Sequence, residues 1–204
     1  MNIGILGTGR MATGLGNRWA KAGHTIVFGS RDLDKGREAI AYIGGDTSVG
    51  SYQEAVDASE VIMITVPWPA VRETLTHLER LRGKILLEIT NVFEDDPAGS
   101  TTEQIIGWAG GARVVKAFNA VFSQILHVPQ EDMLVRPDVF MIGEDADAKA
   151  VIGQLITEAG FDPFDAGGVE NARHLQNLAL FIIEMGYSQK RGMGIGFKIV
   201  QVIP

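Results

Sequence analysis

A glycine-rich segment near the N-terminus has the residue types and spacing that bind the pyrophosphate of a dinucleotide. The apolar run 2–6 leads directly into Gly7-Thr8-Gly9-Arg10-Met11-Ala12, which follows the pattern G-x-G-x-x-A. Gly7 permits the tight turn, Gly9 lets the backbone approach a phosphate, and Ala12 lets the following helix pack close to the strand. The N-terminus of that helix offers free N–H groups and a partial positive charge. The segment therefore predicts a dinucleotide site, and the alternative is a glycine-rich turn without a ligand.

The end of the second apolar run indicates which dinucleotide binds. NAD sites carry an Asp or Glu about 20 residues after the glycine loop, where it accepts hydrogen bonds from the ribose 2′-hydroxyl. This chain has Gly29-Ser30-Arg31 there. A carboxylate would repel a 2′-phosphate, whereas Gly and Ser leave room for it and Arg31 can form a forked, charge-assisted contact. Lys35, one helical turn further on, could add charge. We therefore expect NADP(H) rather than NAD(H); the alternative for Arg31 and Lys35 is a solvated helix start.

Residues at three further strand ends are expected at the nicotinamide end, since ligands of open parallel sheets lie outside the carboxyl ends of the strands. These residues are Val66, Pro67, Trp68, Asn91, Ala117, Phe118 and Asn119. Trp68 is expected either to stack on a ring or to cap the core. Asn91 and Asn119 either hydrogen-bond a carboxamide or ribose, or serve Asx turns. Lys116 ends a buried strand, and we expect it either to reach solvent or to point at a ligand anion.

No other part of the sequence has the residue types of a nucleophilic, acid–base or metal site. Cysteine is absent, which removes thiolate chemistry and disulfides. The four histidines lack the H-x-x-x-H or H-E-x-x-H spacing of metal ligands, and neither a G-x-S-x-G elbow nor a Walker loop occurs. Hydride transfer between two bound rings needs no protein nucleophile, because alignment and desolvation can supply most of the rate. We therefore expect no catalytic side chain and no metal.

Alternating strand and helix patterns would bring these segments to one edge of a sheet. Strands are expected at 2–6, 25–28, 47–50, 60–66, 84–90, 112–116, 138–142 and 161–165. Helices are expected at about 11–22, 32–42, 69–82, 101–109, 146–159 and 171–187, and residues 94–100 have the composition of a surface turn. The alternation predicts an α/β fold with a Rossmann-type, doubly wound, mostly parallel sheet and a C-terminal helical extension. We expect one domain over residues 1–204, in which residues 168–204 form a C-terminal helix and tail.

Composition and charge exclude several classes of partner. The chain has 204 residues, of which 46% are apolar and 21% charged, the mix of a globular protein. The net charge is -7 without a basic block, which disfavours nucleic acid and anionic membranes as partners. No apolar run approaches the length of a membrane span, and the N-terminus lacks a signal-peptide pattern. We expect a cytoplasmic protein whose partner is a small-molecule redox substrate.

One expected helix predicts self-association. Residues 178–183 (LALFII) are apolar on all sides of a helix, and such a helix is buried on more than one side. A single sheet covers only one side, so we expect a homodimer with this helix at or near the interface. The alternative is a central helix enclosed by its own chain.

The chain also resembles a known family in several of these segments. The resemblance lies in GILGTGRMATGLG, Gly29-Ser30-Arg31, Val66-Pro67-Trp68, residues 114–119 (VVKAFN) and Asp165-Ala166-Gly167. The chain is similar to the NADP oxidoreductase, coenzyme F420-dependent family, and to the cytoplasmic oxidoreductase domain of the six-transmembrane metalloreductases. Coenzyme F420 is a deazaflavin. The resemblance implies a Rossmann-type domain, NADPH binding, and hydride transfer to coenzyme F420 or a flavin as an exchangeable substrate.

The resemblance also implies roles for individual residues. Residues 8–11 would wrap the pyrophosphate, and Ser30, Arg31 and Lys35 would hold the 2′-phosphate. Residues 66–68 and 117–119 would border the nicotinamide, and the glycine-rich tail 192–198 is similar to that of the deazaflavin reductases. We expect the acceptor ring between Trp68, residues 118–122 and this tail, because these walls are apolar or backbone and offer no base. Two other functions stay open, reduction of a small imine or keto acid and NADP binding without turnover.

Overall fold

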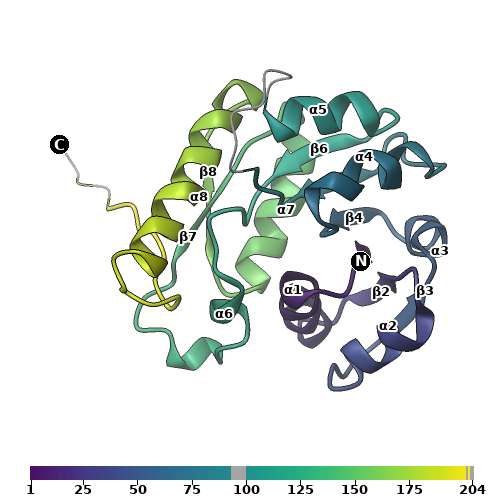
Figure 1. Ribbon diagram of the computed structural model, residues 1–204, viewed down its shortest axis with the longest axis horizontal. Coiled ribbons are helices and arrows are strands. Elements are labelled where there is room, and N and C mark those ends of the chain that lie inside the picture. The colour runs from purple at the N-terminus through teal and green to yellow at the C-terminus, as the bar shows by residue number, and fades with distance from the viewer. Residues whose placement is uncertain (93–99, 201, 203–204) are drawn as a thin grey trace.

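A six-stranded parallel sheet forms the centre of the molecule in the computed structural model, which describes residues 1–92, 100–200 and 202 (Figure 1). The strands lie in the order β3-β2-β1-β4-β5-β6. Their bounds are Asn2–Leu6 (β1), Thr25–Gly29 (β2), Thr47–Gly50 (β3), Val61–Ile64 (β4), Ile85–Glu88 (β5) and Arg113–Lys116 (β6). This order reverses direction between β1 and β4, and such a switch point opens a crevice at the carboxyl ends of the strands. The expected doubly wound fold is confirmed.

Helices cover both faces of this sheet because its strands are apolar on both faces. In β4, Met63 belongs to one buried cluster with Trp19, and Ile62 belongs to the other with Leu75. The first cluster is covered by α1 (Arg10–Lys21) and α7 (Ala146–Glu158), and the second by α3 (Tyr52–Asp57), α4 (Trp68–Thr76) and α5 (Thr101–Trp108). Helix α2 (Leu33–Ile40) contacts β3 at the edge of the sheet. Complete burial of one such side chain contributes about 1.5–3 kcal/mol.

A second, smaller sheet extends the molecule beyond β6. It pairs β7 (Asp138–Met141) in parallel with β8 (Asp162–Asp165), and an antiparallel bridge between Lys116 and Ile142 joins it to the large sheet. Short helices α6 (Ser123–Leu126), η1 (Gln130–Asp132) and η2 (Val169–Asn171) lie in the connections. Arg18, buried in α1, donates hydrogen bonds to the carbonyls of Leu126 and Ala159 and thereby fixes α1 against the ends of α6 and α7.

The C-terminal helix α8 (Ala172–Tyr187) is followed by a tail that folds back onto β7. The carbonyl of Phe197 accepts a hydrogen bond from the N–H of Asp138 at 2.8 Å. The Lys198 ammonium pairs with the carboxylates of Asp138 at 2.7 Å and Asp162 at 2.5 Å. Figure 1 shows α8 and this tail at the opposite end of the molecule from α2.

The helices of the structure differ from the sequence expectations in two respects. Helix α8 is not enclosed by the described part of its own chain, because Phe181 in its middle is 57% exposed. Helices α3 and α6 were not expected.

No helix in the described part of the chain combines the length and hydropathy of a bilayer span. Of the expected surface turn 94–100, all but Ser100 lies outside the described residues.

Candidate dinucleotide-binding site

The glycine loop forms the turn that the sequence predicts at the end of β1. Gly7 has a φ of +125°, and a Cβ there would lie 2.5 Å from the Thr65 hydroxyl oxygen, so only glycine fits. At Gly9, apart from Gly9 itself and its two chain neighbours, no atom of the described residues lies within 4 Å of the position that a Cβ would take, so the loop is open on this side. Gly9 is the N-cap of α1 and no side chain caps this helix. The N–H groups of its first turn are therefore available to an anion.

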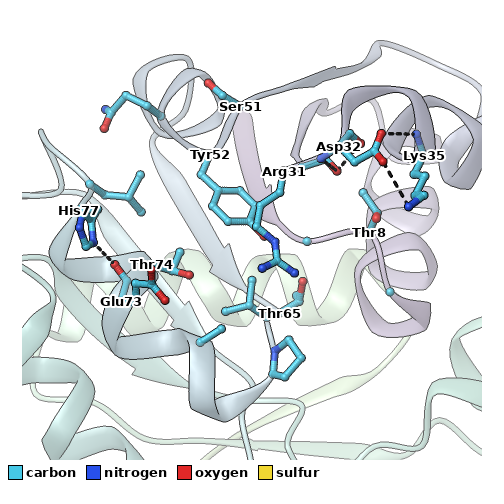
Figure 2. Close-up of a pocket in the computed structure, with 18 residues that line it drawn as sticks. Thr8, Arg31, Asp32, Lys35, Ser51, Tyr52, Thr65, Glu73, Thr74 and His77 are labelled. Carbon is cyan, nitrogen blue, oxygen red and sulfur yellow. Dashed lines mark hydrogen bonds and ion pairs between the residues drawn. The ribbon is translucent and has the colours of Figure 1, made fainter.

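A cavity of about 880 Å³ lies at the carboxyl ends of β1, β2 and β4, next to this loop. Figure 2 shows the residues around it. Among the predicted site residues it is lined by Gly7, Thr8, Gly9, Ser30, Arg31, Lys35, Val66 and Pro67. The fold thus gathers residues 7–9 of the predicted phosphate loop and the predicted 2′-phosphate residues around one cavity, as the carboxyl-edge rule requires, whereas Arg10 and Met11 do not line it.

The end of β2 is shaped against a carboxylate of the NAD type. A Cβ on Gly29 would lie 2.8 Å from the Tyr52 ring atom Cδ1 and 3.1 Å from the Tyr52 Cα. The second of these atoms belongs to the backbone of α3, which a rotamer change cannot move. An Asp or Glu side chain at this position would therefore displace α3. The close approach of Tyr52, which lies outside the local sequence, therefore opposes any side chain at position 29.

Polar groups at the start of α2 are largely engaged with Asp32, which also lines the cavity. The Ser30 hydroxyl donates to the Asp32 carbonyl at 2.7 Å. The Asp32 carboxylate accepts the N–H of Lys35 at 3.1 Å and lies 3.3 Å from the Lys35 ammonium. The accepted N–H of Lys35, together with its ammonium, holds the pKa of Asp32 below its usual value. Arg31 makes no hydrogen bond or ion pair with any described residue, and Figure 2 shows its side chain extending over the cavity.

The far wall of the cavity comes from α3 and α4 and was missed by the sequence reasoning. It includes Tyr52, Glu73, Thr74 and His77. An aromatic ring and an imidazole in such a wall can stack on a flat base or hydrogen-bond to it. Ser51 and Glu54 form a reciprocal cap that starts α3. That S-x-x-E spacing was the available signal for a helix here.

The predicted nicotinamide-end residues occupy several environments. Val66 and Pro67 line the cavity, whereas Trp68 does not. Its ring packs against Trp108 with the centroids 5.6 Å apart. In this structure Trp68 therefore caps the core, which is one of the two positions expected for it. The side chains of Ala117 and Phe118 are buried. Phe118 packs edge-on against Trp19 at 6.2 Å and has a φ of +59°. These two residues can offer a ligand only their backbone.

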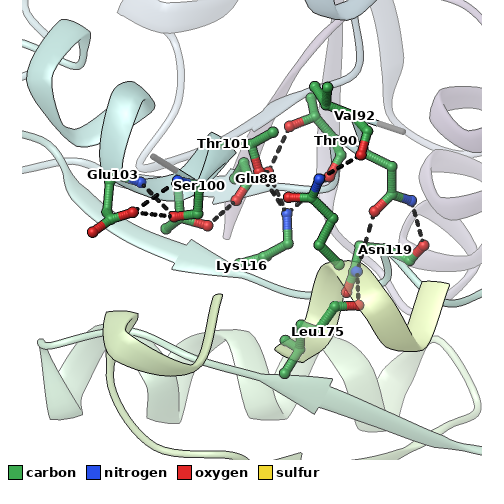
Figure 3. Close-up of polar contacts among 12 residues, drawn as sticks. Glu88, Thr90, Val92, Ser100, Thr101, Glu103, Lys116, Asn119 and Leu175 are labelled. Atoms are coloured by element: carbon green, nitrogen blue, oxygen red, sulfur yellow. Dashed lines mark hydrogen bonds and ion pairs between the residues drawn. The ribbon is translucent and has the colours of Figure 1, made fainter. Parts of the chain in front are cut away.

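Asn91 and Asn119 bond to each other across neighbouring strand ends. The Asn91 amide donates to the Asn119 carbonyl at 2.6 Å, and the Asn119 amide donates to the Asn91 side-chain oxygen at 3.2 Å. The Asn119 amide also donates to the Leu175 carbonyl of α8 at 2.8 Å (Figure 3). The pair therefore joins the ends of β5 and β6 to α8.

Beneath these asparagines lies a fully buried ion pair. The Lys116 ammonium is 2.6 Å from the Glu88 carboxylate, and both side chains have no exposure to solvent. It also donates to the Thr90 carbonyl at 2.8 Å and the Thr101 hydroxyl at 3.0 Å (Figure 3). Both expectations for Lys116 are therefore wrong, because it reaches neither solvent nor a ligand anion. Glu88 and Lys116 are paired in register on adjacent strands, a relation that required the strand order to be known.

The described residues contain no cluster of His, Asp and Glu that could hold a metal ion. Thr101 and Thr102 donate to Glu88 at 3.1 and 2.8 Å, so this buried carboxylate is saturated with protein donors. At the cavity itself, backbone N–H groups, hydroxyls and cations can recognise phosphates and a base.

The strand order, the open glycine loop and the cavity beside it define a Rossmann-type dinucleotide-binding domain. The family model described as NADP oxidoreductase coenzyme F420-dependent matches residues 2–92. The chain is 30% identical to the F420-dependent NADP reductase of Methanothermobacter marburgensis over 96% of this chain and 97% of that protein. The chain belongs to this family of F420-dependent NADP oxidoreductases.

Other proteins are similar to this chain over all or part of their own length. The rat metalloreductase STEAP3 is 27% identical over 89% of this chain, which spans 37% of that protein. The crystal structure of a protein from Arthrobacter sp. FB24 superposes on this chain with a TM-score of 0.86 and 24% identity. The superposition covers 98% of this chain and 100% of that one. A reductive aminase from Aspergillus terreus in complex with NADPH superposes with a TM-score of 0.68 and 21% identity, covering 93% of this chain and 63% of that one. The two structures establish a common fold.

Proposed function

We propose that this protein transfers a hydride between NADPH and coenzyme F420. The observation that carries the proposal is the 30% identity to an F420-dependent NADP reductase along 97% of that protein's length. The reductive aminase of the same fold is only 21% identical to this chain. A deazaflavin acceptor therefore fits this chain better than a small imine or keto acid.

The residues around the cavity fit the parts of NADP(H). The first turn of α1 would bind the pyrophosphate, with Thr8, Gly9, Arg10 and Met11 around it. Arg31, Ser30 and Lys35 would bind the 2′-phosphate, and position 29 itself carries no carboxylate. The aromatic and polar wall formed by α3 and α4 would hold the adenine. Bound NADPH supplies the hydride from its reduced nicotinamide ring.

The nicotinamide would lie against Val66 and Pro67 and against the backbone from Ala117 to Asn119. The hydrogen-bonded pair of Asn91 and Asn119 would keep these strand ends in register, and Trp68 would support the turn from behind through its contact with Trp108. We assign no acid, base or nucleophile, because hydride transfer depends on the distance and alignment of two rings.

The acceptor would bind beside residues 118–122 and the C-terminal tail. In support, Phe122 packs against Tyr187 at the end of α8 with ring centroids 6.1 Å apart. The Gln124 amide lies 2.7 Å from the Met193 sulfur, and the Arg10 guanidinium donates to the Ser123 hydroxyl at 3.3 Å. This region therefore adjoins both the phosphate loop and the glycine-rich tail. Its apolar and backbone surfaces suit a flat tricyclic ring, whether deazaflavin or flavin.

The assay that tests this function follows the absorbance of NADPH with one acceptor at a time. The acceptors are coenzyme F420, FMN, FAD, riboflavin, a cyclic imine and a keto acid. We expect oxidation of NADPH with coenzyme F420 and slower or no oxidation with the flavins. Steady turnover with the imine or keto acid, and with no flavin or deazaflavin, would refute the proposal. Tight NADPH binding without any turnover would favour a sensor.

We further propose that residues 1–204 form one NADP-binding domain, with residues 168–204 as its C-terminal helix and tail, and that two copies form a homodimer. In support of the first, β7 is bridged to β6 and the tail is hydrogen-bonded to β7. In support of the second, α8 exposes Phe181 and Tyr187. A cytoplasmic location stays a prediction from the sequence.

A further inference from the structure

A single carboxylate stands among the cations at the 2′-phosphate end of the cavity. Asp32, Arg31 and Lys35 all line the cavity. Asp32 draws Lys35 toward itself, with 3.3 Å between the carboxylate and the ammonium, and its carbonyl takes the Ser30 hydroxyl. Of the three side chains assigned to the phosphate, two are thus engaged with Asp32. Arg31 alone has no partner among the described residues.

The negative charge of Asp32 opposes a phosphate in two ways. A phosphate monoester carries a charge of about −1.5 to −2 near neutral pH, and a carboxylate lining the same subsite repels it within the screening distance of roughly 8–10 Å. Asp32 also competes with the phosphate for the Lys35 ammonium. In NAD the same ribose position carries a hydroxyl, which can donate to a carboxylate. Asp32 therefore disfavours NADP(H) relative to NAD(H).

The structural role of Asp32 does not require its charge. It is the N-cap of α2, where one carboxylate oxygen accepts the N–H of Lys35 at 3.1 Å. Asparagine caps helices about as well as aspartate because its side-chain oxygen accepts the same bond. The charge and the cap can therefore be separated by one substitution.

We propose that Asp32 is a specificity-determining residue that weakens 2′-phosphate binding and lowers the preference of this protein for NADP(H) over NAD(H). The inference rests on the proposed function, since it takes NADP(H) to be the occupant of the cavity. According to this inference, Lys35 contributes less to phosphate binding while Asp32 is charged.

The test is titration of NADP⁺ and NAD⁺ into the wild type and Asp32→Asn at low and high salt. We expect Asp32→Asn to bind NADP⁺ about three- to tenfold more tightly at low salt, the effect of removing one like charge from a solvated site. NAD⁺ affinity should stay unchanged or fall, and the gain should shrink as salt rises. The matched control is Asp34→Asn, which removes an equal charge from the first turn of α2. Asp34 pairs with Arg37 at 2.7 Å and does not line the cavity, so its removal should change neither affinity by as much as Asp32→Asn.

Lys35→Met in both backgrounds completes the test. If the Asp32 carboxylate holds the Lys35 ammonium in the wild type, Lys35→Met should reduce NADP⁺ affinity more in the Asp32→Asn protein than in the wild type. Unchanged or weaker NADP⁺ binding by Asp32→Asn would overturn the inference, and so would an equal gain for NAD⁺. Failure of the wild type to bind either dinucleotide would refute the proposed function itself. If NADP⁺ binds but coenzyme F420 is not turned over, the proposed function fails, and the titration still decides whether Asp32 weakens NADP⁺ binding.

Discussion

Arg31 differs from its basic neighbours because no described residue pairs with it, although it lines the cavity. Replacing it with Ala should remove a charge-assisted contact to the 2′-phosphate worth about 1.5–3 kcal/mol. We expect a loss of roughly 10- to 100-fold in NADP⁺ affinity, with NAD⁺ affinity little changed, by titration of both dinucleotides. Arg37→Ala is the control, because Arg37 pairs with Asp34 and does not line the cavity. Equal losses for NAD⁺ and NADP⁺ would contradict the assignment of Arg31.

The buried ion pair joins three elements at the nicotinamide end. Lys116 ends β6, Glu88 ends β5, and Thr101 begins α5. Lys116→Met would leave the Glu88 carboxylate without its cation in a dry site, and we expect a loss of about 3–5 kcal/mol in the free energy of unfolding. Urea denaturation followed by circular dichroism measures this loss. The double change Glu88→Leu with Lys116→Met should cost less than Lys116→Met alone, since no unpaired charge stays buried. A greater cost of the double variant would refute this account.

Two helices, α3 and α5, begin with the same reciprocal cap, which makes part of the stability dependent on pH. The Glu54 carboxylate accepts the N–H of Ser51 at 2.6 Å, and the Glu103 carboxylate accepts that of Ser100 at 2.8 Å. These accepted N–H groups lower the pKa of Glu54 and of Glu103 in the folded protein. The resulting stability is present above the unfolded-state pKa of about 4.3 and is lost as the pH falls through the lower folded-state values.

Glutamine at both positions separates this contribution from the rest, because it can accept the same bond without titrating. Between about pH 5 and pH 3, the urea midpoint of the wild type should fall further than that of the variant with Glu54→Gln and Glu103→Gln. Two equal decreases would show that these caps do not contribute to acid sensitivity.

The molecule as a whole exposes an apolar surface on α8. Phe181 is 57% exposed and stacks on Phe197 of the tail with ring centroids 6.5 Å apart. Burial of this surface in a homodimer predicts a mass of about twice 22.0 kDa by light scattering. Phe181→Asp should yield a monomer. Tyr42→Asp is the control, because Tyr42 is 58% exposed but lies just after α2, at the other end of the molecule (Figure 1). A monomeric wild type at micromolar concentration would refute the prediction.

The sequence by itself determined the features that depend on local order. The repeated alternation of apolar strands and amphipathic helices admits little besides a doubly wound parallel sheet, and that prediction is confirmed. The turn at Gly7 was also predictable, because the adjacent spacing encodes a tight turn between a strand and a helix. The second apolar run placed Arg31 just after β2 and Lys35 in the first turn of the next helix, and the carboxyl-edge rule placed them beside the phosphate loop.

Only the tertiary structure decided which distant residues meet. Lys116 is paired with Glu88 across neighbouring strands, and Trp68 is packed on Trp108 of another helix. Tyr52 explains why residue 29 is glycine, although 23 positions separate them in the printed sequence. Each contact depends on strand order and on how the helices lie over the sheet, which local propensity does not encode. A polar residue at the end of a buried strand can serve a ligand or a neighbour equally well, and only the packing showed that Lys116 pairs with Glu88 and that the Asn119 amide donates to the Leu175 carbonyl.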